Sequence, residues 1–233
     1  MCALYIDERF IYEISGEKMN KYLQLLEKAY SGIVFDVLRS FGHPNCVLPD
    51  TIRPLNLEHS IVGPAFTVEG QANSDLTEHE SLTQWCQMLS KAPKGHIVIC
   101  QPNDGNVAHM GELSSETFVY KGVTGYIVDG GCRDSGFITK TGFPVWSKYY
   151  TPRDVVGCWQ PTAFNQPITI GGVEIKANDI IFADRDGVVV IPSDLLEQVA
   201  NKVDELIHTE NKVRTAILSG TDPVDAYLKY GKF

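Results

Sequence analysis

The chain has 233 residues, of which 43% are hydrophobic and 21% are charged, and its formal net charge is −9 at pH 7. This composition is typical of a globular protein with a sizeable core, and the acidic charge, with no basic patch against it, argues against nucleic acid as a partner. Six cysteines without a CxxC pair and an N-terminus without a signal-peptide pattern predict a reduced, cytoplasmic compartment. No apolar run is long enough to span a membrane.

Helical periodicity dominates the first part of the chain. The spacing of apolar residues predicts a helix from residue 19, a break near Ser31 and a second short helix that ends at Gly42. The segment "SIVGPAFTVEG", which begins at Ser60, predicts a strand with an irregularity at its Gly-Pro pair. Residues 79–92 predict an amphipathic helix.

The middle of the chain alternates between strand and helix patterns. The buried strand "HIVIC" is followed by a polar loop, the helix "ELSSETFVYKG" and the strand "GYIVDG". This order predicts a crossover between two parallel strands. A further short helix is expected in "SGFITKTG", before the segment "FPVWSKYYTP".

The last part is β-rich and then helical. Residues 161–192 predict strands joined by tight turns at Gly171–Gly172 and Asp186–Gly187. One long helix follows, which Ser193 is expected to cap and Gly220 to end. Because no repeat, linker or shift in composition interrupts the chain, we predict a single α/β domain.

The stretch "GYIVDGGCRDSG" places two opposite charges, Arg133 and Asp134, just after a buried strand. Ligand sites in α/β sheets gather beyond the carboxyl ends of strands, and Gly130–Gly131 supply a turn that could bring both side chains to one ligand. Two alternatives stand beside this interpretation: Asp134 caps the following helix, and Arg133 pairs with a carboxylate elsewhere. Asp129 is interpreted as a turn former.

A second candidate element is "HMGELSS", which runs from His109 to Ser115. A glycine at the start of a helix lets a ligand approach the free backbone N–H groups, which favour an anion such as a carboxylate. His109 and the other histidines show no metal-ligand spacing, so we interpret them as non-ligands.

Four segments of this chain, taken together and in the same order, resemble the RraA-like family. That family joins the regulator of ribonuclease activity A to the 4-hydroxy-4-methyl-2-oxoglutarate aldolases. The likeness runs from about Ser31 to the C-terminus. The segments are "IVGPAFTV" (Ile61 to Val68), "MGELSSETFVYKGVTGYIVDGGCRD" (Met110 to Asp134), "TGFPVW" (Thr141 to Trp146) and "ADRDGVVVIP" (Ala183 to Pro192).

The resemblance implies a fold, an assembly and a cofactor. The fold would be an α/β sandwich of the swivelling β/β/α type over residues 31–233 with a long C-terminal helix, preceded by an N-terminal extension and helix over residues 1–30. The assembly would be a homotrimer or homohexamer. The aldolases of the family are class II pyruvate aldolases, which use a divalent metal, commonly Mg²⁺ or Mn²⁺, rather than a Schiff-base lysine.

The resemblance also assigns roles to individual residues. Arg133 would contact the keto oxygen of the substrate, and Asp134 would hold the metal. Glu210 would reach the metal site of a neighbouring subunit. The pyruvate carboxylate would lie against the backbone amides of the loop formed by Gly111, Glu112, Leu113 and Ser114.

These roles predict a carbon–carbon lyase that acts on small 2-oxo acids. Cleavage beside a ketone, by retro-aldol reaction or by decarboxylation of oxaloacetate, builds negative charge on the ketone oxygen as a pyruvate enolate forms, and a metal and an arginine would stabilise it. The alternative is a non-catalytic, protein-binding regulator of the ribonuclease-inhibitor type. One departure bears on the substrate: aldolases of the family usually carry an acidic residue where this chain has Phe137.

Overall fold

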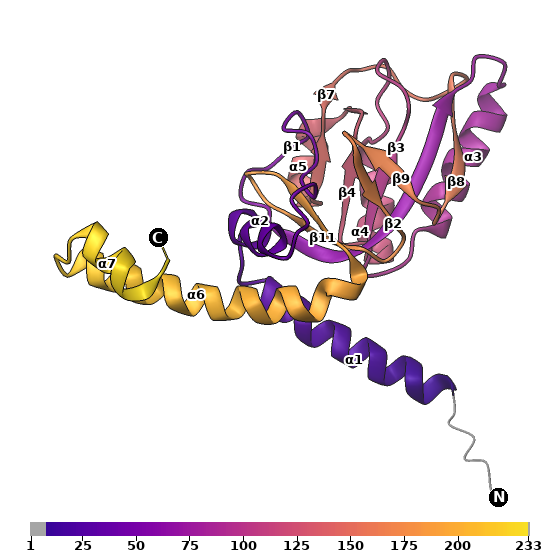
Figure 1. The fold of residues 1–233 in the computed structure, drawn as a ribbon. Helices are drawn as coiled ribbons and strands as arrows, with labels where there is room; N and C mark the ends of the chain where they lie inside the picture. Colours follow the sequence, from indigo (N-terminus) through magenta and orange to yellow (C-terminus); the bar gives the residue numbers. More distant parts are fainter. Residues whose placement is uncertain (1–7, 233) are drawn as a thin grey trace, which may run out of the picture.

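Strand β2 (Ile61–Ala72) organises the sheet in the computed structural model, which describes residues 8–232 (Figure 1). It pairs in parallel with β3 (Ile97–Gln101) and antiparallel with β11 (Ile180–Ala183) and β8 (Trp159–Phe164). The irregularity predicted at its Gly-Pro pair lies instead between Glu69 and Gly70, where the register with β8 shifts. A side chain at Gly70 would overlap the ring of Trp159, so glycine is required where the ring approaches the backbone.

The predicted crossover is confirmed: β3 and β4 are parallel neighbours, with α4 between them in the chain. The order of the main sheet is β1-β6-β4-β3-β2-β11-β12, with β8 on β2, and β5 pairs separately with β7. The other elements between residues 53 and 150 are α3 (Glu78–Lys91), α4 (Glu112–Lys121), α5 (Ser135–Thr141), β1 (Arg53–Pro54), β4 (Gly125–Val128), β5 (Gly131–Cys132), β6 (Val145–Ser147) and β7 (Tyr149–Tyr150).

Both predicted hairpin turns are present. Gly171 and Gly172, each with a positive φ, join β9 (Ile168–Ile170) to β10 (Val173–Ile175). Asp186–Gly187 lies between β11 and β12 (Val188–Ile191), which pair antiparallel.

The core explains why the chain folds into layers. Alternate residues of β3 point to opposite faces of the sheet: Val98 packs with α3, α4 and α5, whereas Ile99 packs with the β9–β10 hairpin. A strand covered on both faces reads as a continuous apolar run, as "IVIC" does. The helix layer, the main sheet and the hairpin layer make the single-domain α/β fold with a β/β/α arrangement that was expected.

Helix α1 (Glu8–Leu26) lies along α6 (Leu196–Leu218), below the sheet in Figure 1. Its residues Tyr22 and Leu26 are buried in one cluster with α2 (Ser31–Ser40) and α6. The predicted break falls where α2 begins, and the backbone N–H of Ser31 donates to the carboxylate of Asp184 at 2.8 Å. The domain boundary at residue 31 remains a prediction, although α1 shares a core with the domain.

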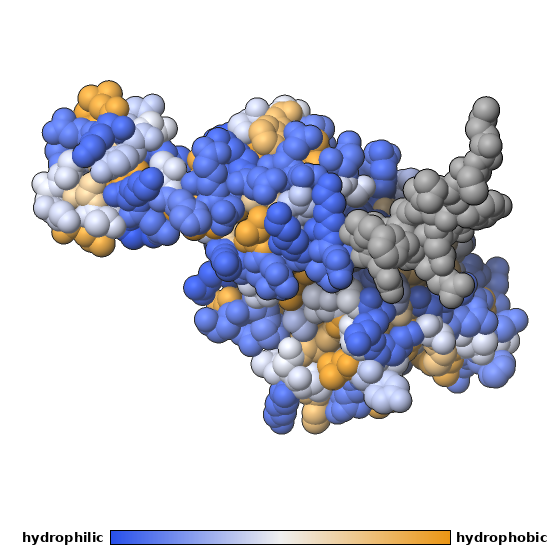
Figure 2. All heavy atoms as spheres, turned by 90° about the horizontal axis from the view of Figure 1, so that it is seen from below, coloured by the Kyte–Doolittle hydropathy of each residue, from blue (hydrophilic) through white to orange (hydrophobic). Residues whose placement is uncertain are grey.

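The C-terminal helix differs from its prediction in two ways. Ser193 does not cap it through its side chain: residues Ser193–Leu195 form a 3-10 turn, and the Ser193 N–H donates to Asp179 Oδ1 at 3.0 Å. A further helix, α7 (Pro223–Tyr230), follows Gly220, with Asp222 as its cap. The outer part of α6 and α7 form an arm that projects from the body, and Figure 2 shows apolar residues at its outer end, where Leu218 and Leu228 are exposed. In the described part of the chain, no helix is long and apolar enough to cross a membrane.

Candidate active site

A cavity of about 450 Å³ opens where the chain leaves β4 and where α4 begins. It brings together every predicted site residue except Glu210: Arg133, Asp134 and the loop from Gly111 to Ser114. Asp154, from the loop after β7, completes its polar side. Helix α3 and two valines of the loop after β7 supply most of its apolar side.

Arg133 is held in place by two carboxylates. Its Nε lies 3.5 Å from Asp134 Oδ2, and its Nη1 donates to Asp154 Oδ2 at 3.0 Å. Its backbone N–H donates to the carbonyl of Met110 at 2.9 Å, which joins it to the loop before α4. Within residues 8–232, Nη2 makes no hydrogen bond. The guanidinium is therefore fixed in position and retains N–H groups for a ligand.

Asp134 has a left-handed backbone, with φ 55° and ψ 28°, which aspartate adopts more readily than most residues. It stands at the N-cap position of α5, but its side chain makes no capping hydrogen bond, so the capping alternative is wrong. Its Oδ2 instead accepts from the backbone N–H of Glu112 at 3.2 Å. In the described chain Oδ1 accepts no hydrogen bond. The side chain is 37% exposed and faces the cavity that Arg133 shares.

Gly111 allows the start of α4 to lie close to the Arg133–Asp134 pair. A Cβ at this position would lie 2.9 Å from Asp134 Oδ2 and 3.4 Å from Arg133 Nε. Its φ of −149° is an ordinary extended value, so the requirement is for space and not for backbone freedom. A larger residue here would separate the start of α4 from the Arg133–Asp134 pair.

The role of Gly130–Gly131 differs from the one predicted. We expected these glycines to adopt backbone conformations that other residues resist, but neither has a positive φ. They are small because other groups pack against them. A Cβ at Gly130 would lie 2.6 Å from His109 Nδ1, and one at Gly131 would meet the ring of Tyr149.

The first turn of α4 presents unpaired amides to the cavity. The Ser115 N–H bonds to the carbonyl of Gly111 at 3.0 Å, whereas those of Leu113 and Ser114 find no acceptor among the described residues. The Ser114 hydroxyl is buried and accepts from the indole N–H of Trp85 at 3.0 Å, which ties the turn to α3. A helix start with free N–H groups favours an anion, as the sequence predicted.

Asp154 is a site residue that sequence reasoning missed. It contacts Arg133 from 21 positions further along the chain, and its Oδ1 accepts from the backbone N–H of Val156 at 3.2 Å. The alternative that Arg133 pairs with a carboxylate elsewhere therefore holds, and the pair lines the same cavity. No local pattern marks Asp154, because only the fold brings its loop to Arg133.

His109 and Asp129 lie behind the cavity and do not line it. His109 is fully buried, edge-on to Trp159 at 5.1 Å, with its Nε2 3.6 Å from Asp104 Oδ2. Burial lowers the pKa of His109 to about 4, the nearby Asp104 opposing that shift, so the ring is neutral near pH 7. Asp129 pairs with Lys148 at 2.9 Å, in agreement with a structural role.

The oxygen donors of the cavity fit a hard divalent cation. Asp134, Asp154 and Glu112 all line it, and Mg²⁺ is commonly bound by one or two carboxylates while it keeps several waters. No group of three or more His, Cys, Asp or Glu side chains arranged for a metal occurs within residues 8–232. Phe137, which replaces the usual acidic residue, is exposed on α5 outside this cavity, with Lys140 over its ring.

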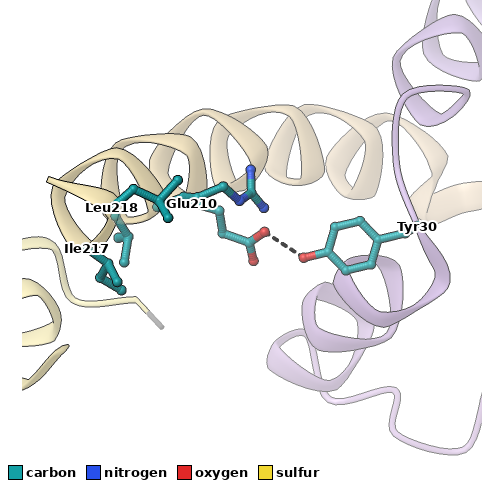
Figure 3. A pocket seen from close by; sticks show the side chains of 6 residues that line it. Tyr30, Glu210, Ile217 and Leu218 are labelled. Atoms are coloured by element: carbon teal, nitrogen blue, oxygen red, sulfur yellow. Dashed lines mark hydrogen bonds between the residues drawn. The ribbon is translucent and has the colours of Figure 1, made fainter.

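Glu210 lies in a different pocket, of about 340 Å³, between α6 and Tyr30 (Figure 3). Its carboxylate accepts from the Tyr30 hydroxyl at 2.6 Å and lies 3.4 Å from Lys232 Nζ. Burial and the bond to Glu210 raise the pKa of Tyr30 to about 12, which keeps its hydroxyl a donor. Within one chain, Glu210 does not join the Arg133 cavity, and its role in a neighbouring subunit stays a prediction.

Two proteins are similar to this chain in sequence. Protein DlpA of Legionella pneumophila is 31% identical over 220 residues, which are 89% of this chain and 33% of that protein, so the chain spans about a third of that relative. A Halalkalibacterium halodurans protein, provisionally named as a 4-hydroxy-4-methyl-2-oxoglutarate aldolase, is 30% identical over 185 residues, 78% of this chain and 83% of its own.

A solved structure supports the fold assignment. The Streptomyces coelicolor protein RraAS2, described as an unusual member of the RNase ES inhibitor RraA protein family, superposes with a TM-score of 0.74 at 24% identity. The match covers 83% of this chain and 96% of that one. The sequence profile of the RraA-like family, described as Aldolase/RraA, matches residues 32–190. The chain therefore belongs to the RraA-like family, which includes both aldolases and non-catalytic ribonuclease inhibitors.

Proposed function

We propose that this protein is a divalent-metal-dependent lyase that acts on small 2-oxo acids and releases pyruvate through its enolate. The reactions that fit are retro-aldol cleavage of 4-hydroxy-2-oxo acids and decarboxylation of oxaloacetate. One observation carries the proposal: a fixed guanidinium, an open carboxylate oxygen and unpaired helix amides converge on one cavity. The aldolase name of the Halalkalibacterium relative supports it.

Arg133 would stabilise the charge that develops in the reaction. When the bond between C3 and C4 breaks, its electron pair moves into the enolate and negative charge builds on the keto oxygen. A donor already fixed in position stabilises that charge without reorganising during the reaction. The contacts of Arg133 with Asp134 and Asp154 provide this fixation.

The start of α4 would bind the carboxylate of the substrate. The N–H groups of Leu113 and Ser114 are suited to an anion, and Gly111 brings them close to Arg133. With the carboxylate held there, the adjacent keto group is directed toward the guanidinium. Positioning of this kind removes much of the entropic barrier to reaction.

The cofactor of the proposal is Mg²⁺ or Mn²⁺. Asp134 would hold it through the oxygen that accepts no hydrogen bond in the described chain, with Asp154 and Glu112 as further oxygen donors on the wall. When bound, such an ion supplies additional positive charge to the keto oxygen.

A coupled lactate dehydrogenase assay for pyruvate tests the proposal. We expect release from 4-hydroxy-2-oxo acids or oxaloacetate that stops after chelation, returns with Mg²⁺ or Mn²⁺, and falls about 10²–10³-fold in Arg133→Ala. The matched control is Arg39→Ala, which removes an exposed arginine on α2. Release that is indifferent to chelation or to Arg133→Ala would refute the proposal.

We also propose assembly as a homotrimer or homohexamer. Exposed apolar side chains on α4 and α5 offer a surface to bury, among them Leu113, Tyr120 and Phe137. Light scattering after size exclusion would give three or six times the chain mass of 25.9 kDa. The same surface is the feature that favours the alternative, a protein-binding regulator, and that function would survive Arg133→Ala.

A further inference from the structure

The charged side chains around the cavity bear on its substrate. The ionisable side chains of the lining are three carboxylates, Glu112, Asp134 and Asp154, and one guanidinium, Arg133. No lysine, histidine or second arginine lines the cavity in the described chain. Nε and Nη1 of Arg133 face the two aspartates, and the proposed function uses its remaining N–H groups for the keto oxygen, so none is left for a distant carboxylate.

Much of the remaining lining, here called the apolar wall, consists of hydrophobic side chains. Helix α3 contributes Leu82, Trp85 and Leu89, and the loop after β7 contributes Val155 and Val156. The one N–H group of the indole is used by Ser114, so the Trp85 ring offers the cavity no free polar group. A wall of this kind lowers the free energy of an apolar substituent and does nothing for a charged one.

We propose that the preferred substrates of this site are 4-hydroxy-2-oxo monocarboxylic acids with an apolar substituent at C4, and not dicarboxylic acids. This inference rests on the proposed function. The single carboxylate would bind the amides of α4, and the substituent would lie against the wall of α3. A second carboxylate would meet no cationic side chain of the lining other than Arg133, which would serve the keto oxygen.

The reaction on such a substrate is balanced without a further reactant. The C3–C4 bond breaks, the C4 hydroxyl loses its proton and becomes the carbonyl of an apolar aldehyde, and C3 gains a proton to give pyruvate. No oxidant or reductant takes part.

A substrate series tests the preference with the pyruvate assay. From 4-hydroxy-2-oxopentanoate to the hexanoate and heptanoate, we expect kcat/KM to rise about fourfold for each added methylene. The value for 4-hydroxy-2-oxoglutarate is expected to lie about tenfold or more below that of the hexanoate, which has a similar length. A dicarboxylate that equals or exceeds the hexanoate would overturn the inference.

A substitution in the apolar wall gives a second test. Leu82→Arg places a cation on α3 at a side chain that is already 45% exposed, so the fold should tolerate it. We expect the ratio of dicarboxylate to monocarboxylate kcat/KM to rise about tenfold. In Leu57→Arg, where the leucine is 53% exposed and outside the cavity, the ratio should not change. Equal ratios in both variants and the unmodified protein would contradict a role for the wall.

A binding experiment separates this inference from the proposed function. 2-Oxohexanoate and 2-oxoglutarate lack the 4-hydroxyl and cannot undergo the retro-aldol step, so their affinities in the presence of Mn²⁺ can be measured by calorimetry without turnover. We expect 2-oxohexanoate to bind at least about tenfold more tightly. Tighter binding of 2-oxoglutarate overturns the inference, whatever the pyruvate assay shows. Tighter binding of 2-oxohexanoate without pyruvate release from any substrate would refute the lyase and leave only the preference of the cavity for a monocarboxylate ligand with an apolar substituent.

Discussion

The Arg133–Asp134 cavity and the Glu210 pocket each set a carboxylate near a cation, and they differ in which polar groups remain without a partner. At the Arg133–Asp134 cavity, Asp134 Oδ1 and Arg133 Nη2 make no hydrogen bond in the described chain. In the pocket of Glu210, Tyr30 contacts one carboxylate oxygen and Lys232 approaches the other. The residue types are nearly the same, but in the described chain one oxygen of Asp134 makes no hydrogen bond, whereas both carboxylate oxygens of Glu210 have a partner.

The difference teaches how to distinguish a candidate site from a structural ion pair. Glu210 lies on a regular helix, α6, and is only 16% exposed, so its contacts resemble those that hold an element in place. Asp134 has a left-handed backbone, and a neighbouring glycine leaves room for its carboxylate. Unusual backbone together with open polar groups is the combination found at functional sites.

Asp134→Asn gives the largest effect expected from this comparison. The amide keeps the shape and tolerates the left-handed backbone, but it loses the charge that would hold a metal. We expect kcat/KM for pyruvate release to fall about 10³-fold while the unfolding midpoint changes little. Activity within a few-fold of the unmodified protein would mean that Asp134 does not hold the metal. The Arg133–Asp134 cavity would then have no better claim to be a functional site than the Glu210 pocket.

The burial of His109, next to the loop that lines the first cavity, predicts a pH dependence of stability. Burial lowers the pKa of His109 to about 4, from an ordinary value of 6.5 in the unfolded chain. Between these two values only the unfolded chain binds the proton, so the free energy of unfolding should fall as the pH drops from 6.5 to 4, by at most about 3 kcal/mol. Urea titrations at pH 7, 5 and 4 would measure it.

The control for this prediction is a second histidine. His109→Gln should flatten the pH dependence, whereas His208→Gln, which removes an exposed side chain on α6, should leave it as steep as before. A slope that survives His109→Gln would mean that the ring is not the group responsible.

Gly111→Ala tests the first site by steric crowding, without changing any charge. The added methyl would lie 2.9 Å from Asp134 Oδ2, so the loop and the carboxylate must separate by a few tenths of an ångström. We expect a loss of about 10-fold to 10²-fold in kcat/KM, since small displacements at a site are costly, with the circular dichroism unchanged. Gly136→Ala, on α5 two residues after Asp134 and with open space around it, is the matched control and should retain activity.

Glu210→Gln should have the smallest effect. Tyr30 and Lys232 would lose a charged acceptor, and the free energy of unfolding should fall by about 1 kcal/mol. The same variant tests the cross-subunit role predicted for Glu210, which requires Mn²⁺ to bind more weakly while the assembly stays intact. An unchanged Mn²⁺ affinity would restrict Glu210 to the contacts in its own chain.

The sequence by itself was enough for what depends on neighbours along the chain. Apolar runs predicted β3 and β4, and the order of strand, helix and strand predicted their crossover. The turns at Gly171–Gly172 and Asp186–Gly187 are where glycine and aspartate predicted them. The resemblance located Arg133, Asp134 and the start of α4, all of which line one cavity. These features are readable because secondary structure follows periodicity and turn chemistry over a few residues.

The tertiary structure alone decided which side chains meet. Asp154 reaches Arg133 from a loop 21 residues away, Asp134 contacts Glu112 and does not cap α5, and Gly130–Gly131 are small because His109 and Tyr149 pack against them. Ser193 likewise does not cap α6, because a 3-10 turn over Ser193–Leu195 separates it from the helix, which begins at Leu196. Such contacts depend on how distant segments pack, which a local pattern does not encode, and they determine which charges in the site remain open to a ligand.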